Sequence, residues 1–147
     1  MTLAGETATE RLGAALARGL RPGDAVLLSG ELGAGKTTLA RFILRALGVT
    51  DHVPSPTFTL VQSYETPGLT LHHFDLYRIE EASEMAELGL DDALNDGAAL
   101  VEWPERGFPA RLAGEALHIA LTAAGADIRE ARIIGPARWR DHLGHLA

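Results

Sequence analysis

Cysteine is absent from this chain of 147 residues, and lysine and asparagine occur only once each, at Lys36 and Asn95. The lack of cysteine excludes disulfides, thiolate catalysis and cysteine-ligated zinc, and it is typical of a cytoplasmic protein. The sequence also lacks any apolar run long enough to cross a bilayer. We therefore expect a cytoplasmic protein that does not enter a membrane.

Positive charge is scarce as well, because 13 Lys and Arg residues face 20 Asp and Glu residues, for a formal net charge of −7. Proteins that bind nucleic acid through its phosphates are usually basic, so we expect no autonomous binding of RNA or DNA. An acidic chain can still join a nucleic-acid complex through a protein partner. All the other basic residues are arginines, a bias that fits a GC-rich genome or a thermophilic source, so the single lysine is conspicuous.

The order of the predicted elements favours an α/β fold. Two strands are separated only by a Pro67-Gly68 turn, so they are predicted to form an antiparallel hairpin and to make the central sheet mixed. No segment has the composition of a linker, and we expect residues 1–147 to form a single domain. The predicted strands are 25–29, 57–65, 70–77, 98–103, 116–122 and 129–134, and the predicted helices are 6–20, 36–47, 82–88, 91–95 and 136–146.

Residues 30–37, Gly-Glu-Leu-Gly-Ala-Gly-Lys-Thr, match the phosphate-binding pattern G-x-x-x-x-G-K-[ST] in full. Glycines let successive backbone N–H groups turn toward phosphate oxygens, and the helix that follows adds its positive N-terminal end. Lys36 is expected to reach the β- and γ-phosphates, and the Thr37 hydroxyl to bind Mg²⁺. The alternative is a chance match in a glycine-rich turn, but the preceding strand and the following helix favour a nucleotide site.

The apolar stretches of two predicted strands each lead into an acidic residue, 71–75 into Asp75 and 98–102 into Glu102. Proteins with this kind of loop need an acid near the phosphates, for Mg²⁺ and for the attacking water. Glu102 follows the more apolar strand and is the better candidate, although both acids can serve, one on the metal and one on water. The alternative is an exposed acid at a strand end, which is common in α/β proteins.

Three further features near these motifs have two interpretations each. His72 and His73 suggest a metal site, but adjacent strand residues point to opposite faces and cannot easily share one ion. Ser55-Pro56-Thr57 is either a stiff loop that senses a γ-phosphate, as in GTPase switches, or an ordinary strand entry. Trp103 lies either beside the nucleotide or in the core.

The nucleotide and the reaction class are constrained by what is missing. Guanine selectivity of the Ras type needs an Asn-Lys-x-Asp element, which is impossible without a second lysine, so ATP is favoured over GTP. A small-molecule kinase would carry an arginine-bearing lid, for which Arg106 and Arg111 are the candidates. That stretch is short and contains Gly107 and Pro109.

Four segments together resemble one family. They are GELGAGKTT at 30–38, SPTFTLV at 55–61, HFDLYR at 73–78 and VEWPE at 101–105. In this order and spacing they resemble the bacterial tRNA threonylcarbamoyladenosine biosynthesis ATPases, the TsaE family, over nearly the whole chain. The resemblance implies a P-loop NTPase fold with a mixed sheet flanked by helices.

The same resemblance implies a weak Mg²⁺-dependent ATPase that acts with the TsaB–TsaD heterodimer. That complex transfers a threonylcarbamoyl group to N6 of adenosine 37 in tRNAs that read ANN codons, and ATP hydrolysis resets it between turnovers. The protein would contact tRNA only indirectly. The alternatives are a small-molecule kinase of the P-loop class and a nucleotide-dependent scaffold without useful turnover.

The resemblance also assigns roles to residues. It implies that Lys36 acts on the phosphates, that Asp75 supports hydrolysis through the water, and that Thr37 and Glu102 ligate Mg²⁺. The other positions implied to bind the nucleotide are Glu6, Thr9, Glu31, Gly33, Ala34, Gly35, Thr38, Thr57, Trp103, Glu105 and Arg129.

Overall fold

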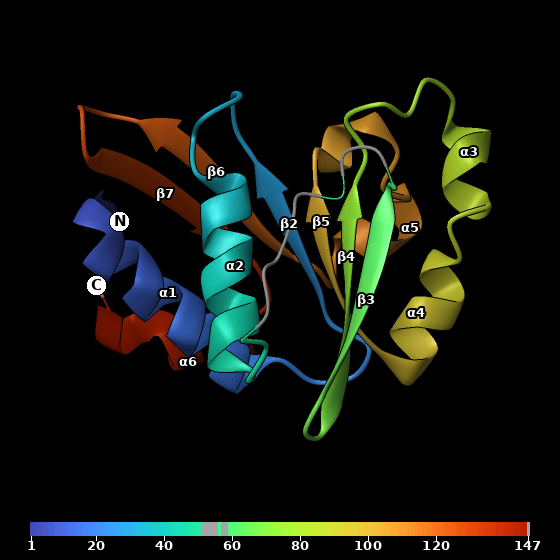
Figure 1. Cartoon of the computed structure of the whole chain (residues 1–147), viewed down its shortest axis with the longest axis horizontal. Helices are drawn as coiled ribbons and strands as arrows, with labels where there is room; N and C mark the ends of the chain where they lie inside the picture. Colours follow the sequence, from blue (N-terminus) through green and yellow to red (C-terminus); the bar gives the residue numbers. More distant parts are fainter. Residues whose placement is uncertain (51–55, 57–58, 147) are drawn as a thin grey trace.

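The computed structural model describes residues 1–50, 56 and 59–146, and within them the strands form one mixed sheet (Figure 1). The strand order is β1-β7-β6-β2-β5-β4-β3. The central strands β6, β2, β5 and β4 run parallel, whereas β3, β7 and β1 are antiparallel to their neighbours. The mixed α/β sheet expected from the sequence is confirmed. The strands are β1 (Thr2–Ala4), β2 (Ala25–Ser29), β3 (Val61–Thr66), β4 (Leu69–Asp75), β5 (Gly97–Glu102), β6 (Leu117–Ala123) and β7 (Ile128–Ile134).

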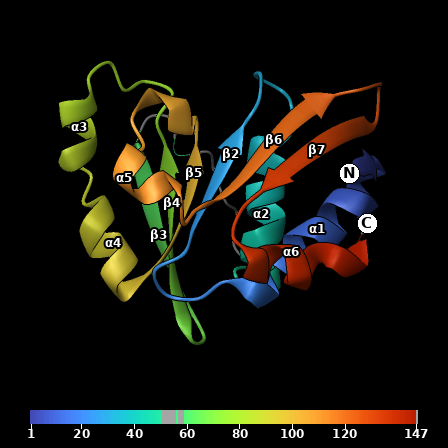
Figure 2. The same cartoon turned by 180° about the vertical axis from the view of Figure 1, so that it is seen from behind.

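Helices cover both faces of the sheet. Helices α1, α2 and α6 pack on one face, and α3, α4 and α5 pack on the other. Figure 2 shows the molecule from behind, where α5 can be seen. None of the helices within the described ranges combines the length and the apolar character that a bilayer crossing requires. The helices are α1 (Gly5–Gly19), α2 (Lys36–Ala46), α3 (Ala82–Ala86), α4 (Leu90–Asp96), α5 (Ala110–Ala113) and α6 (Ala137–Leu143), with 3₁₀ turns at Pro104–Arg106 and Gly144–Leu146.

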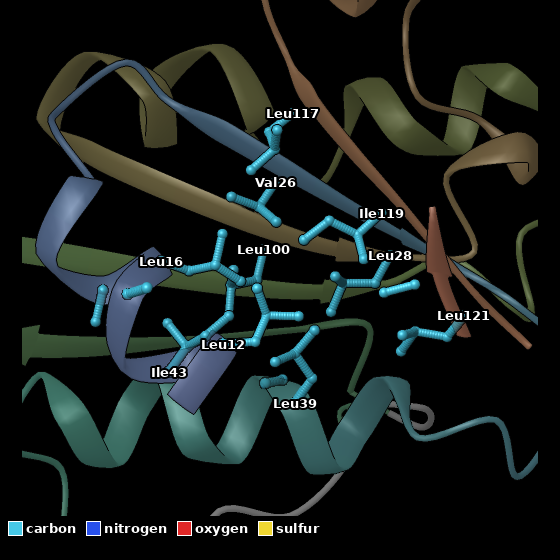
Figure 3. Packing of buried hydrophobic residues seen from close by; sticks show 14 of the residues in the cluster. Leu12, Leu16, Val26, Leu28, Leu39, Ile43, Leu100, Leu117, Ile119 and Leu121 are labelled. Atoms are coloured by element: carbon cyan, nitrogen blue, oxygen red, sulfur yellow. The ribbon is translucent and has the colours of Figure 1, made fainter. Parts of the chain in front are cut away.

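Strand β2 lies between the two hydrophobic clusters of the protein and contributes residues to both. Its apolar run is buried on both faces, as expected for a central parallel strand. Val26 and Leu28 belong to the hydrophobic cluster under α1 and α2, whereas Leu27 belongs to the cluster under α3 to α5. Figure 3 shows Leu12 of α1 and Leu39 of α2 in the first of these clusters. This packing anchors the segment that leads into the glycine-rich loop.

Several predicted boundaries were wrong. The strand predicted at 70–77 ends at Asp75, because the backbone N–H of Tyr77 donates to Asp75 Oδ1 at 2.9 Å and closes a turn. The strand predicted at 57–65 begins at Val61, and residues 57 and 58 lie outside the described ranges. The helix predicted at 136–146 is α-helical only to Leu143. Strand β1 was not predicted, since three residues are too few to show a period.

The crossing of α1 and α2 yields a stability prediction. A Cβ built on Gly13 would lie 2.7 Å from Phe42 Cβ and 3.2 Å from the Ile43 nitrogen, so even one methyl group cannot be added without a shift. We expect Gly13→Ala to lower the free energy of unfolding by about 1–3 kcal/mol. Urea denaturation followed by circular dichroism measures it.

Gly144→Ala is the matched control, because nothing lies within 4 Å of its built Cβ. Its free energy of unfolding is expected to stay within about 0.5 kcal/mol of the original. Equal stability of the Gly13→Ala protein and this control would contradict the close helix contact.

Candidate functional site

The site predicted from sequence lies at the carboxyl ends of the parallel strands, where α/β sheets usually bind ligands. Strand β2 ends at Ser29 and continues into the glycine-rich loop (residues 30–35). Strands β4 and β5 end at Asp75 and Glu102, which face each other in the parallel register. The pairing of three strands therefore places the loop and both acids at one edge of the sheet (Figure 1).

The backbone of the glycine-rich loop depends on its glycines. Gly30 has φ of 147°, and a Cβ there would lie 2.5 Å from the Leu121 carbonyl oxygen. Gly35 has φ of 105° and precedes α2, whose first turn has neither a side-chain cap nor an acidic residue. The N–H groups and the positive end of an 11-residue helix are thus left for an anion.

Lys36 folds back over the glycine-rich loop and is only 5% exposed. Its Nζ donates to the carbonyl oxygens of Gly30 and Glu31, the latter at 3.1 Å. The same ammonium lies 4.0 Å from the centroid of the Trp103 ring, close enough for a cation–π contact. These contacts hold the charge where the loop, α2 and β5 meet.

Burial lowers the pKa of the Lys36 side chain below its usual 10.5, and nearby carboxylates oppose this shift. The acids that raise the pKa are, in order of effect, Glu102, Glu105, Asp75 and Glu31. Lys36 is the only lysine of the chain, and its ammonium lies among four carboxylates. Such a cluster is suited to hold a polyanion only together with a cation that offsets the acids.

Glu102 has both carboxylate oxygens engaged. Oε1 accepts a hydrogen bond from Thr37 Oγ1 at 3.0 Å, and Oε2 lies 2.6 Å from His73 Nε2. Adjacent ligands of an octahedral Mg²⁺ lie about 3.0 Å apart, since Mg–O bonds are about 2.1 Å long. Thr37 and Glu102 therefore fit two neighbouring positions of such an ion.

The remaining ligands of a Mg²⁺ ion would have to come from elsewhere. Within the part of the chain that the structure describes, no three His, Cys, Asp or Glu side chains converge as a metal site. Mg²⁺ is commonly held by one or two protein groups together with phosphate oxygens and water. The oxygen donors at Thr37 and Glu102 match that arrangement.

Trp103 follows Glu102 in a left-handed conformation, with φ of 57°. Positive φ is uncommon for a residue with a large side chain, and such strain is often found at functional sites. The conformation turns the indole from the sheet toward Lys36, with the Tyr77 ring centroid 4.9 Å away. Trp103 is half-buried and also packs at the border of a core cluster.

Every predicted site residue in the described ranges lines one of three adjoining cavities around the glycine-rich loop. The cavity of about 310 Å³ contains Lys36, Thr37, Asp75, Glu102 and Trp103. The others have volumes of about 300 and 560 Å³. The cavity of about 300 Å³ is lined by Glu6, Thr9, Ala34, Gly35, Thr38 and Arg129, and the cavity of about 560 Å³ by Glu31, Gly33, Ala34, Trp103 and Glu105. Thr57 lies outside the described residues.

Arg129 reaches the loop from β7, far away in sequence. Its Nε donates to the Ala34 carbonyl at 3.0 Å, and a second nitrogen lies 3.4 Å from the Gly33 carbonyl. The guanidinium thus supports the loop from outside and borders two of the cavities. Sequence reasoning missed Asp127 and Leu3, which line the cavity of about 300 Å³ together with Arg129, because no motif marks the β6–β7 turn or β1.

The two histidines lie on opposite faces, as expected from strand alternation. His73 is fully buried beside Glu102. His72 instead lies 2.7 Å from both Ser63 Oγ and Asp96 Oδ1, on the α4 side of the sheet. The pair is therefore not one metal site.

The arginines considered for a kinase lid are placed separately. Arg106 lies over the Tyr77 ring, 5.4 Å from its centroid. Arg111 forms an exposed ion pair with Asp91 at 2.8 Å and lines none of the three cavities. The helix that carries Arg111 has only four residues.

Comparison with known proteins identifies close similarity to one group. The family model described as "Threonylcarbamoyl adenosine biosynthesis protein TsaE" matches residues 3–132. Two relatives named tRNA threonylcarbamoyladenosine biosynthesis protein TsaE come from Rickettsia felis and Streptomyces coelicolor. The Rickettsia protein is 44% identical over 106 residues, which cover 71% of this chain and 62% of that protein. The Streptomyces protein is 41% identical over 136 residues, which cover 87% and 91%.

The chain thus spans less than two thirds of the Rickettsia protein but nine tenths of the Streptomyces one. Among solved structures, the crystal structure of Bacillus subtilis YdiB superposes with a TM-score of 0.77 and 31% sequence identity. The superposition covers 99% of this chain and 91% of that one.

Proposed function

Because the chain belongs to the TsaE family of threonylcarbamoyl adenosine biosynthesis proteins, we propose that it is a Mg²⁺-dependent ATPase serving this tRNA modification. The family membership connects the chain with the biosynthesis of threonylcarbamoyladenosine in tRNA. ATP is its proposed substrate and Mg²⁺ its proposed cofactor.

The observation that carries the proposal is the pair of oxygens on Thr37 and Glu102, 3.0 Å apart beside the buried ammonium of Lys36. P-loop proteins hold Mg²⁺ with a hydroxyl from the start of the helix and a carboxylate from a strand end. They hold the β- and γ-phosphates with a lysine at the start of the same helix. Glu102 also ends the strand beside β2, the position of the metal-site acid in this class.

Each residue then has a separate part in the proposed reaction. Lys36 leaves its loop carbonyls to contact the phosphates, and the N–H groups before α2 bind the phosphate oxygens. Thr37 and Glu102 would hold Mg²⁺, and the ion would neutralise charge that develops on the phosphates. Asp75 orients the attacking water, since it lines the same cavity as Lys36, Thr37 and Glu102.

The nucleotide is proposed to be ATP. Guanine recognition by an Asn-Lys-x-Asp element is impossible because Lys36 is the only lysine. The cavity lined by Glu6, Thr9 and Thr38 adjoins the loop and is the proposed site of the nucleoside. Its volume of about 300 Å³ is at the lower end of the range for small-molecule sites.

The partner is proposed to be the TsaB–TsaD heterodimer, with ATP hydrolysis resetting it between turnovers. The net charge of −7 supports this division, because an acidic protein is poorly suited to grip tRNA itself. Contact with tRNA is therefore left to the partner complex.

The proposal is tested by depleting the protein from its host and measuring threonylcarbamoyladenosine at position 37 of tRNAs that read ANN codons. We expect the modified nucleoside to disappear and to return when the original chain is expressed. With Mg–ATP labelled in the γ-phosphate, the purified protein is expected to transfer the label to water as free phosphate. Transfer of the label to a metabolite instead would support a kinase, and unchanged tRNA modification would contradict the proposal.

Trp103 is expected to report nucleotide binding. Its indole lies against Lys36, so ATP or ADP that displaces this ammonium changes the surroundings of the ring. Trp139, on α6, is 1% exposed in the hydrophobic cluster that α1 and α2 also form, and its emission is expected to respond little. A Trp103→Phe protein, which keeps only Trp139, gives the background to subtract. Unchanged Trp103 emission with calorimetrically confirmed binding would place the nucleotide elsewhere.

The same signal tests coupling to TsaB–TsaD. A partner that distinguishes nucleotide states must change nucleotide affinity by the factor with which the nucleotide changes partner affinity. We expect the heterodimer to shift the Trp103 titration with ATP. A heterodimer that binds while leaving the ATP and ADP affinities both unchanged would exclude ATP-gated assembly.

A further inference from the structure

We propose that His73 is a positioning residue that holds the Glu102 carboxylate in the orientation required for Mg²⁺. The inference rests on the proposed Mg²⁺-dependent nucleotide site. It starts from a hydrogen bond between two buried side chains, His73 Nε2 and Glu102 Oε2, at 2.6 Å. The exposed fractions of the two side chains are 0% and 3%.

The parallel register of β4 and β5 creates this contact. Asp75 faces Glu102, and His73 faces Leu100, two residues earlier on each strand. Because side chains alternate in direction along a strand, His73, Asp75 and Glu102 all point to the face covered by α2. His73 and Glu102 are diagonal neighbours, close enough for an imidazole to reach a carboxylate.

Glu102 needs such a partner for two reasons. A buried carboxylate without hydrogen bonds is costly, and Thr37 engages only one of its oxygens. The terminal torsion of a glutamate is also broad, so a single contact leaves the carboxylate free to rotate. With His73 Nε2–H donating to Oε2, the other oxygen, Oε1, is directed at Thr37, where the metal is proposed.

The donor–acceptor assignment agrees with the surroundings of the imidazole. Nε2 faces an acceptor, so it carries the proton in this contact. Nδ1 is buried and has no hydrogen-bond partner among the described residues. All polar contact that the described residues make with this ring therefore goes to Glu102. Carboxylates that bind metals are themselves oriented by hydrogen bonds from neighbouring side chains, and loss of such a partner typically lowers metal affinity 10- to 100-fold.

The test measures Mg²⁺ binding rather than turnover. The protein with bound ADP is titrated with Mg²⁺, and the Trp103 emission and calorimetric heat give the Mg²⁺ concentration for half-saturation. For His73→Leu we expect this concentration to rise about 10- to 100-fold, as for the loss of other metal-supporting partners. ADP affinity in the presence of EDTA is expected to stay unchanged.

Two variants separate positioning from a general packing role. His73→Gln carries an amide N–H near the place of Nε2 and is expected to restore most of the Mg²⁺ affinity. His72→Leu, on the opposite face of the same strand, is the matched control and is expected to keep the original affinity. If His73→Leu does not fold, His73→Asn replaces it, because its shorter amide stays polar but cannot reach Oε2.

The outcomes distinguish this inference from the proposed function. A folded His73→Leu or His73→Asn protein with the original Mg²⁺ affinity would overturn the role of His73 while leaving the ATPase proposal intact. An original protein whose nucleotide binding ignores Mg²⁺ would overturn both. Equal losses in His73→Gln and His73→Leu would assign the histidine to packing and also overturn the inference.

Discussion

Replacement of Lys36 by alanine is expected to abolish ATP hydrolysis and to weaken ATP binding about 10- to 100-fold, because a hydrogen bond to a charged group contributes about 1.5–3 kcal/mol. Lys36 is 5% exposed, and the chain has no second lysine to replace it. Calorimetry measures the loss of binding, and phosphate release measures the loss of hydrolysis.

Lys36→Arg is expected to fail as well. The ammonium fits between two loop carbonyls and the face of Trp103, with the ring centroid 4.0 Å from Nζ. A planar guanidinium is larger, and its fixed fork cannot occupy the same compact position. The expected loss of hydrolysis is about as large as in the alanine variant.

Arg18→Ala is the control for charge, since it removes an exposed cation from the end of α1. Its hydrolysis rate is expected to equal that of the original protein. An active Lys36→Arg enzyme would refute our explanation of why lysine is needed at this position.

Asp75→Asn is expected to lower the rate of hydrolysis at least about 100-fold, the lower range for a group that handles the attacking water. ATP and Mg²⁺ binding are expected to persist, because the amide is isosteric and its oxygen can still accept from the Tyr77 backbone N–H. The Trp103 titration and single-turnover phosphate release check the two parts separately.

Glu102→Ala provides the contrast within the same register pair. It removes a proposed ligand, so the Mg²⁺ concentration needed for ATP binding is expected to rise sharply. ATP binding without metal is expected to change much less. Identical binding defects in the Asp75 and Glu102 variants would contradict this division of roles.

Local sequence determined the centre of the fold. Strand β2 was predicted at residues 25–29 and lies at Ala25–Ser29, and the helix predicted from Lys36 begins there. Four consecutive apolar residues, glycines with positive φ and a helix-forming segment each act through neighbours in the chain. Asp75 and Glu102 were predicted near the ends of strands, and each is the last residue of its strand. The nucleotide site itself was predicted from the motif at residues 30–37.

Periodicity and residue type did not indicate which distant groups meet, and only the family resemblance placed Thr37, Glu102 and Arg129 at one site. Thr37 and Glu102 are 65 positions apart, Arg129 and Ala34 are 95 apart, and each pair touches only after the sheet forms. The bond from His73 to Glu102 likewise depends on the register of β4 against β5. Strand register is set by burial of whole faces and by long-range pairing, to which no single segment's periodicity is sensitive. Residue types therefore determined what chemistry the chain can perform, and tertiary packing decided which side chains hold one another in place for it.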